Sequence, residues 1–231
     1  MAEELIQKYD DLHLAGRENP QILEGLLAAN EQYPNNVEIM WRISRAYYDR
    51  NELSSDKAVK KDFVEKGFNM INKANEVNAN HWAVHKWMAI MYSALGDHVS
   101  SKEKIANAFK IKEHALKALE LKPNDPTTLH LLGRWCMTIA NISWIERGIA
   151  SALFGTPPTS SFEEALDYFL KAHAVGSTDP TTLRNTIFIG DCYTQLKNGA
   201  KAKEYYTLAA ETVPKNDFDK TLIQEAKSKI K

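Results

Sequence analysis

The sequence contains no uninterrupted apolar run of the roughly 18–20 residues that a membrane-spanning helix needs. Residues 1–10 are acidic and amphipathic and have no apolar stretch of the kind found in secretory signals. Only two cysteines are present, Cys136 and Cys192, and both lie in predicted helices. Unpaired cysteines in helices fit a reducing compartment better than a disulfide scaffold. These absences predict a soluble, cytoplasmic protein.

Strand signals, catalytic motifs and excess charge are also missing. There are few β-branched runs, and no Asn-Gly or Asp-Gly pair separates two alternating segments. The chain has no G-x-S-x-G nucleophile, Walker loop, dinucleotide fingerprint or C-x-x-C pair. The net charge of −1 gives no general attraction to nucleic acid or to an anionic membrane. We therefore expect an all-α protein that acts by binding, with no enzyme activity, no cofactor and no nucleic-acid partner.

Two histidines have a spacing that metal sites sometimes use. His81 and His85 are four residues apart and could share one helical face. A third ligand at a suitable spacing is not apparent, so we expect no metal site.

The sequence does contain a repeat. Between residues 189 and 214 it places a glycine, small alanines, two tyrosines and a final proline at fixed intervals: Ile189, Gly190, Tyr193, Ala202, Tyr206, Ala209 and Pro214. This is the spacing of a tetratricopeptide repeat, a helix–turn–helix unit of about 34 residues. Gly190 allows close helix approach, and Pro214 cannot continue the second helix. One such hairpin cannot bury its apolar face alone, so we expect more of them.

Weaker copies of this spacing recur along the chain, for example at Leu129, Leu132, Gly133 and Cys136. We predict an all-α, tetratricopeptide-like helical-hairpin solenoid that forms a single domain over residues 1–231. The expected hairpins lie near residues 2–34, 35–79, 80–123, 124–178 and 179–214. A C-terminal capping helix over 218–231 is expected to cover the open end with a lysine-rich outer face.

Two insertions interrupt the repeat. Residues 51–61 are polar and predict a loop and an extended second-helix start, with Ser54 or Ser55 as the N-cap. Residues 139–158 place apolar side chains at helical spacing: Ile142, Ile145, Ile149 and Leu153. This second insertion predicts either a longer first helix in the fourth hairpin or an extra amphipathic helix after it. We expect its apolar face to pack on a neighbouring repeat; the alternative is a flap over the groove, or a surface for a partner or lipid.

In arrays of this type, the first helix of each hairpin lines the concave wall. Transferring the repeat register places aromatic and cationic side chains there: Trp41, Arg45, Tyr48, Trp82, His85, Tyr92, His130, Arg134, Met137 and Arg184. Aromatic rings offer contact area at low entropic cost, and guanidinium groups bind carboxylate or phosphate through two hydrogen bonds. We therefore expect a groove for an elongated ligand with at least one anionic group. The alternative is that several of these aromatics are core residues and the register is displaced by one.

A second candidate surface is basic. Four lysines fall within one short stretch: Lys102, Lys104, Lys110 and Lys112. Such a cluster could bind an acidic flexible tail of a partner in a salt-dependent manner. The alternative is an ordinary solvated helix face.

Three segments, Leu131–Cys136 (LLGRWC), Ser143–Glu146 (SWIE) and Ala150–Pro157 (ASALFGTP), resemble the regulator of microtubule dynamics family. The resemblance extends from about Ala28 to the end of the chain. It implies microtubule binding and a part in chromosome segregation, with association to the cytoskeleton, the spindle and the spindle poles. Some relatives carry an N-terminal membrane anchor and hold phospholipid in the helical domain. This sequence starts at the repeats, so we expect the soluble, spindle-associated form without a transmembrane anchor.

The resemblance leaves three functions open. Tubulin presents acidic C-terminal tails, which either the lysines or the arginine-lined groove could bind. A phospholipid would need an apolar trough with a cationic site for its headgroup, which the aromatic groove residues with Arg45 or Arg134 could form. A generic scaffold that binds an acidic peptide tail is the third alternative. Partners expected from the resemblance are tubulin and other spindle proteins.

Overall fold

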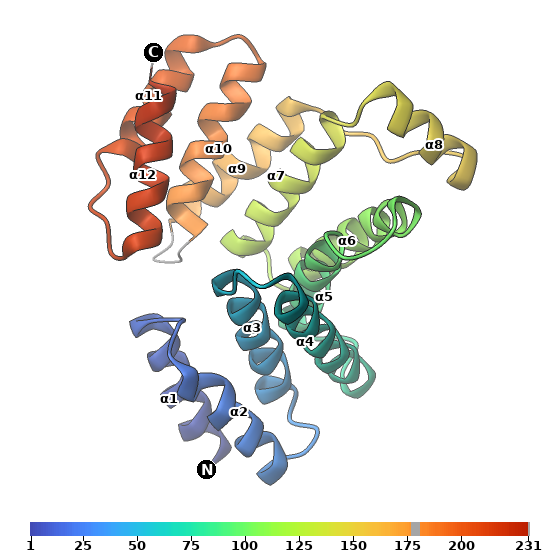
Figure 1. The fold of residues 1–231 in the computed structure, drawn as a ribbon, viewed down its shortest axis with the longest axis vertical. Helices are drawn as coiled ribbons and strands as arrows, with labels where there is room; N and C mark the ends of the chain where they lie inside the picture. Colours follow the sequence, from blue (N-terminus) through green and yellow to red (C-terminus); the bar gives the residue numbers. More distant parts are fainter. Residues whose placement is uncertain (177–180, 231) are drawn as a thin grey trace. The chain divides into compact units, whose positions relative to one another are not determined.

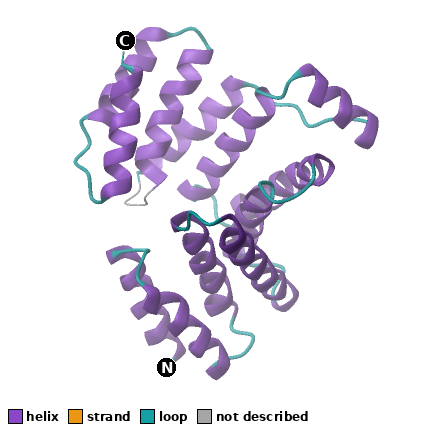
Figure 2. Cartoon of the chain, in the orientation of Figure 1, coloured by secondary structure: helices purple, strands orange, loops and turns teal. Residues whose placement is uncertain are grey.

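The computed structural model describes residues 1–176 and 181–230, and every regular element in this part of the chain is an α-helix (Figures 1 and 2). The first six helices are α1 (Ala2–Ala15), α2 (Pro20–Gln32), α3 (Val37–Leu53), α4 (Lys57–Val77), α5 (Trp82–Leu95) and α6 (Ser101–Leu121). The others are α7 (Pro126–Ala140), α8 (Trp144–Phe154), α9 (Phe162–Val175), α10 (Thr181–Gln195), α11 (Gly199–Ala210) and α12 (Asp217–Lys229). The predicted all-α fold is confirmed. The expected boundary at residues 178 and 179, and the end of the capping helix at residue 231, lie outside the described residues.

The chain groups into two compact units, Met1–Leu121 and Lys122–Lys231. We expected one continuous domain; that remains a prediction, and each unit is described by itself below. None of the described helices has the length and apolar character needed to cross a membrane.

The first unit consists of three helical hairpins, α1–α2, α3–α4 and α5–α6, with α3 also packed against α2 and α5. Short polar side chains cap α2, α3 and α4: at α3, for example, the Asn36 side chain accepts hydrogen bonds from the backbone N–H groups of Glu38 and Ile39. The core between the first two hairpins is aliphatic apart from one ring: Tyr9, Ile22, Leu26, Ala29, Ile39, Ile43 and Ala46. Burial of this apolar surface is what joins the hairpins.

The insertion at residues 51–61 is mostly helical. Because α3 continues to Leu53 and α4 begins at Lys57, the loop is only three residues long. The predicted N-cap, Ser54 or Ser55, is wrong. Asp56 caps α4, because its carboxylate accepts from the backbone N–H groups of Ala58 at 2.8 Å and Val59 at 3.1 Å. A carboxylate there also interacts favourably with the positive end of the helix dipole.

In the second unit, α7 pairs with α9, α10 packs on both α9 and α11, and α12 packs on α11. Two glycines permit these close pairings. A Cβ at Gly133 would lie 2.6 Å from the Phe169 ring, and one at Gly190 would lie 2.5 Å from the Tyr206 ring. As expected of a capping helix, α12 buries one face, through Leu222, Ile223 and Ala226, and exposes lysines.

The second insertion forms a separate helix. Helix α7 ends at Ala140, and α8 begins at Trp144 after a short turn. The apolar side chains of α8 are exposed: 81% of Trp144, 55% of Ile145, 46% of Ile149 and 45% of Leu153. The expected packing of this face on a neighbouring repeat is therefore not seen within the second unit.

Candidate anion-binding faces on the first helices

The predicted groove residues lie on the first helices of four hairpins. In the first unit, α3 carries Trp41, Arg45 and Tyr48, and α5 carries Trp82, His85 and Tyr92. In the second unit, α7 carries His130, Arg134 and Met137, and α10 carries Arg184. The two sets belong to different units, so each is described within its own.

In the first unit, Trp41, Arg42 and Arg45 of α3 form what we call the arginine face. This face already holds a carboxylate, that of Asp10 from α1. Arg42 Nε lies 3.0 Å from both oxygens of Asp10, and Arg42 Nη2 lies 2.6 Å from Oδ2. Arg45 Nη2 donates to Oδ1 at 2.8 Å. Both guanidinium groups lie over the Trp41 ring, at 4.0 Å and 5.2 Å from its centroid. This is a carboxylate site with a two-point hydrogen-bond fork and an aromatic base.

The charges at this site shift one another's protonation. Burial raises the pKa of Asp10, but hydrogen bonds and charge from Arg42 and Arg45 outweigh burial, so the pKa falls below its usual value. Burial lowers the pKa of Arg45, and Asp10 opposes that shift. The Arg45 Nε–H is buried and has no hydrogen-bond partner among the described residues. The guanidinium therefore keeps hydrogen-bonding capacity that Asp10 does not use.

Glu38 connects this site to α5. Its Oε2 accepts from Trp41 Nε1 at 2.8 Å and from Arg42 Nη1 at 2.7 Å. Its Oε1 lies 2.9 Å from His81 Nε2, just before α5. These contacts fix the orientation of the Trp41 ring, which is 7% exposed and lies 6.5 Å from the Trp82 ring. Sequence reasoning missed Asp10, Glu38 and Arg42; the nearest signal was the arginine directly after Trp41.

The remaining predicted residues of the first unit make ring contacts. Tyr48 meets Trp87 edge-on at 5.8 Å, and Tyr92 stacks on His114 of α6 at 5.8 Å. His85 is buried, and its Nδ1 lies 2.8 Å from His114 Nδ1. Because its Nε2 donates to the Ala79 carbonyl at 2.9 Å, the Nδ1 of neutral His85 accepts a hydrogen bond from His114.

A positive charge on His114 is disfavoured. Burial, and secondly His85, lower the pKa of His114 to about 4. Neutral imidazoles are the usual metal-ligating form, yet the described residues contain no cluster of three or more His, Cys, Asp or Glu side chains that could hold an ion.

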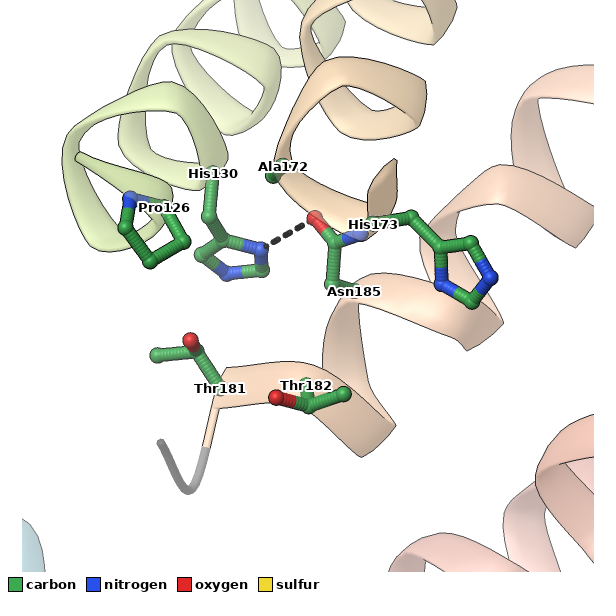
Figure 3. A pocket seen from close by; sticks show the side chains of 7 residues that line it. All are labelled: Pro126, His130, Ala172, His173, Thr181, Thr182 and Asn185. Carbon is green, nitrogen blue, oxygen red and sulfur yellow. Dashed lines mark hydrogen bonds between the residues drawn. The ribbon is translucent and has the colours of Figure 1, made fainter. Parts of the chain in front are cut away.

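In the second unit, His130 is also buried, but it pairs with an amide. Its Nδ1 lies 3.0 Å from Asn185 Oδ1 (Figure 3). Asn185 Nδ2 donates to the Phe169 carbonyl at 2.9 Å. The small cavity beside this pair is also lined by Pro126, Ala172, His173, Thr181 and Thr182. Its volume of about 10 Å³ is enough for about one water molecule. This cavity is too small for an organic ligand.

Arginine residues flank an aromatic ring in the second unit as well. The guanidinium carbons of Arg134 and Arg184 each lie 5.9 Å from the Phe188 centroid. Arg184 Nη1 donates to Glu225 Oε2 of α12 at 2.7 Å. Arg134 is exposed and forms no ion pair with any described residue. We call Arg134, Phe188 and the flanking His130 the Phe188 face; Met137, one turn along α7, is half-buried.

The four predicted lysines of α6 are not one patch. Lys102, Lys104 and Lys110 are exposed, and Lys112 is half-buried. Successive helical residues are rotated by about 100°, so the four lysines point in directions spread around the whole circumference of α6 and do not share one face. Lys110 also forms an ion pair with Glu113 at 2.9 Å.

Fold and faces together define a tetratricopeptide-like helical repeat protein whose first helices present polar and aromatic side chains. The structure of a thermophilic TPR protein from Thermus thermophilus is similar, with a TM-score of 0.67 over 99% of this chain and 100% of that chain. At 14% identity, this similarity shows the fold alone. It confirms the predicted all-α, tetratricopeptide-like solenoid.

The family is defined by sequence. The family model "Regulator of microtubule dynamics protein 1-3" matches residues 5–231, and the chain belongs to this family. Regulator of microtubule dynamics protein 1 of Bos taurus is 38% identical over 226 residues, which cover 97% of this chain and 69% of the relative. Protein 3 of Xenopus laevis is 36% identical over 208 residues, which cover 90% of this chain and 44% of the relative. The resemblance drawn from the sequence is thereby confirmed.

Proposed function

We propose that this chain regulates microtubule dynamics by binding tubulin, and that it acts by binding rather than by catalysis. The chain belongs to a family whose members are named for the regulation of microtubule dynamics, and this membership supports the first part of the proposal. The exposed Arg134 beside the Phe188 ring, with no ion pair among the described residues, is the observation that carries the contact.

The chemistry of the Phe188 face suits an acidic peptide. A guanidinium can donate two parallel hydrogen bonds to one carboxylate. The adjacent Phe188 ring restricts the Arg134 side chain before binding, so the side chain loses less conformational entropy when a carboxylate binds. Tubulin presents acidic C-terminal tails, so the proposed contact joins a tail carboxylate to Arg134. The other groove arginines, Arg45 and Arg184, already pair with Asp10 and Glu225.

Co-sedimentation with microtubules tests this contact. Arg134→Gln is expected to lower the affinity about tenfold, because a hydrogen bond to a charged group contributes about 1.5–3 kcal/mol. Arg147→Gln, on α8 of the same unit, removes the same charge away from the Phe188 face and serves as the matched control. Removal of the acidic tails from tubulin should abolish the difference between Arg134→Gln and the unsubstituted chain.

The rival surface is tested in parallel. Charge reversal at Lys102, Lys104, Lys110 and Lys112 would abolish binding if the lysines carried it, with Arg134→Gln unchanged. If neither set of substitutions matters, both tubulin contacts are wrong. Tail-independent binding that survives high salt also contradicts the proposal, because contacts between charges are screened.

The broader roles are predictions from the family resemblance. They comprise spindle organisation, chromosome segregation, and location in the cytoplasm, on the cytoskeleton and at the spindle poles. Phospholipid binding and a generic acidic-peptide scaffold are the alternatives. Native mass spectrometry that shows co-purified phospholipid would favour the first, and retention of an acidic peptide without affinity for microtubules would favour the second.

A further inference from the structure

Helix α1 contributes Tyr9 to the core of the first unit, and Leu5, Ile6 and Leu12 pack partly buried against that core. Only Tyr9 of α1 is buried, and α1 packs on α2 much less extensively than α3 packs on α4. A hollow of about 410 Å³ lies between α1 and α2, lined by Lys8, Tyr9, Leu12, Gln21, Glu24 and Gly25. The apolar attachment of α1 is therefore smaller than the one that joins α3 to α4.

Polar contacts also join α1 to α3. Asp10 pairs with Arg42 and Arg45, as described above. His13 Nε2 lies 3.0 Å from Asp49 Oδ2, one turn further along both helices. These pairs are largely shielded from water, with Arg42 and Arg45 only 10% and 12% exposed, so each guanidinium depends on an oppositely charged partner. An attachment of this type can be exchanged for a similar one.

The arginine face of α3 is complete without α1. Trp41, Arg42 and Arg45 come from a single helix, and Glu38 of that helix holds the Trp41 ring and Arg42 in position. Asp10 contributes only a carboxylate, and Arg45 Nε remains buried without a partner among the described residues. An external carboxylate could therefore occupy the place of Asp10 and meet the same donors.

We propose that Trp41, Arg42 and Arg45 form a second binding site, for a carboxylate-rich peptide segment, that α1 covers by placing Asp10 in it. Binding then requires α1 to leave α3, so the apparent affinity is reduced by the fraction of molecules in which α1 is undocked. This site goes beyond the proposed function: it lies in the other unit, and its test needs no microtubules.

The test measures binding of a fluorescein-labelled octaglutamate peptide to the full chain by fluorescence anisotropy at low ionic strength. Asp10→Asn removes the competing charge and is expected to tighten peptide binding roughly tenfold by raising the undocked fraction. Asp11→Asn is the matched control, because Asp11 is exposed, carries the same charge on the same helix and pairs only with Gln7. The gain should disappear in Asp10→Asn/Arg45→Gln and persist in Asp10→Asn/Arg134→Gln.

Amide hydrogen exchange provides the conformational readout. Asp10→Asn should accelerate exchange in α1 and leave α4 and α6 unchanged. His13→Gln loosens α1 without altering the proposed site, so it should raise peptide affinity in the same direction and by less. This variant keeps the test decisive if Asp10→Asn does not fold.

Three results would overturn the proposal: equal peptide affinity in Asp10→Asn and Asp11→Asn, a gain that survives Arg45→Gln, or a gain without faster exchange in α1. If His13→Gln folds and shows no gain, the covering role of α1 is also wrong. Tighter binding of anionic phospholipid vesicles without tighter binding of octaglutamate would overturn the choice of a peptide ligand. Each of these failures leaves the Arg134 contact with tubulin untouched.

Discussion

Both units place arginine side chains beside an aromatic ring, but they differ in whether a carboxylate of the same unit pairs with each guanidinium. In the first unit, Arg42 and Arg45 lie over Trp41 and share the carboxylate of Asp10. In the second, Arg184 pairs with Glu225 of α12, whereas Arg134 is exposed beside the same Phe188 ring. Whether an arginine on a first helix can bind an external carboxylate thus depends on whether another helix already supplies a carboxylate to it.

The rings themselves are also held differently. Trp41 is fixed by polar partners, Glu38 and the arginines. Phe188 is fixed by apolar packing, since Phe169 lies 5.5 Å away and is completely buried. The stability of the arginine face in the first unit should therefore depend on charge substitutions and salt concentration. The stability of the Phe188 face in the second unit should depend on the packing of the core beneath it.

The largest expected effect comes from a substitution in the core beneath the Phe188 face. Phe169→Ala should lower the free energy of unfolding by about 3–5 kcal/mol, because it removes a buried ring and leaves a cavity. Urea denaturation followed by circular dichroism measures the loss. The Phe188 ring would also lose its support, so binding by Arg134 should weaken with it.

The exposed Trp144 of α8 provides the matched aromatic control. Trp144→Ala should change stability by no more than about 0.5 kcal/mol, because the side chain has little packing to lose. Equal losses at the two positions would show that the ring at 169 is not the support described here.

A smaller effect compares the ion pairs of the two faces. A double-mutant cycle for Asp10 and Arg45 should give a coupling energy of about 1–2 kcal/mol, since the Arg45 side chain is only 12% exposed. The same cycle for Arg184 and Glu225, both about one-third exposed, should give about 0.2–1 kcal/mol. Thermal or urea denaturation of the four chains in each cycle measures both. A larger coupling in the second unit would contradict the comparison.

The last comparison concerns pH. His85 pairs with His114 in the first unit, whereas His130 pairs with Asn185, which does not titrate, in the second. The pKa of His114 is lowered from 6.5 to about 4, so the unfolded chain binds this proton more readily than the folded one. The contribution to stability is therefore complete above pH 6.5 and is lost as the pH falls towards about 4.

Melting temperatures measured across this pH range test the sign. His114→Gln should flatten the decline, and His98→Gln, in the loop between α5 and α6, is the control that should not. The groups that influence His114 are His85, Glu113 and Lys110. If the melting temperature of His114→Gln falls as steeply with decreasing pH as that of the unsubstituted chain, groups other than His114 cause the loss of stability.

The hairpin pattern could be predicted because its causes are local. Gly133 and Gly190 are needed where the Phe169 and Tyr206 rings approach, and each stands at the glycine position of the first-helix repeat pattern. The insertion at 139–158 was harder, because periodicity alone does not tell a longer α7 from a separate α8. The N-cap at Asp56 was missed because three candidate capping residues follow one another and only one accepts the backbone hydrogen bonds.

By itself, the sequence determined the helical hairpins, the family, and which aromatic and cationic residues lie on first helices. Periodicity and side-chain size act over one or two helical turns, so the linear order contains them. Only the tertiary structure decided which arginines are already paired, because Asp10 and Glu225 reach their partners from other helices over 35 and 41 positions. The spread of the α6 lysines around their helix, by contrast, follows from the rotation of about 100° per residue and is local.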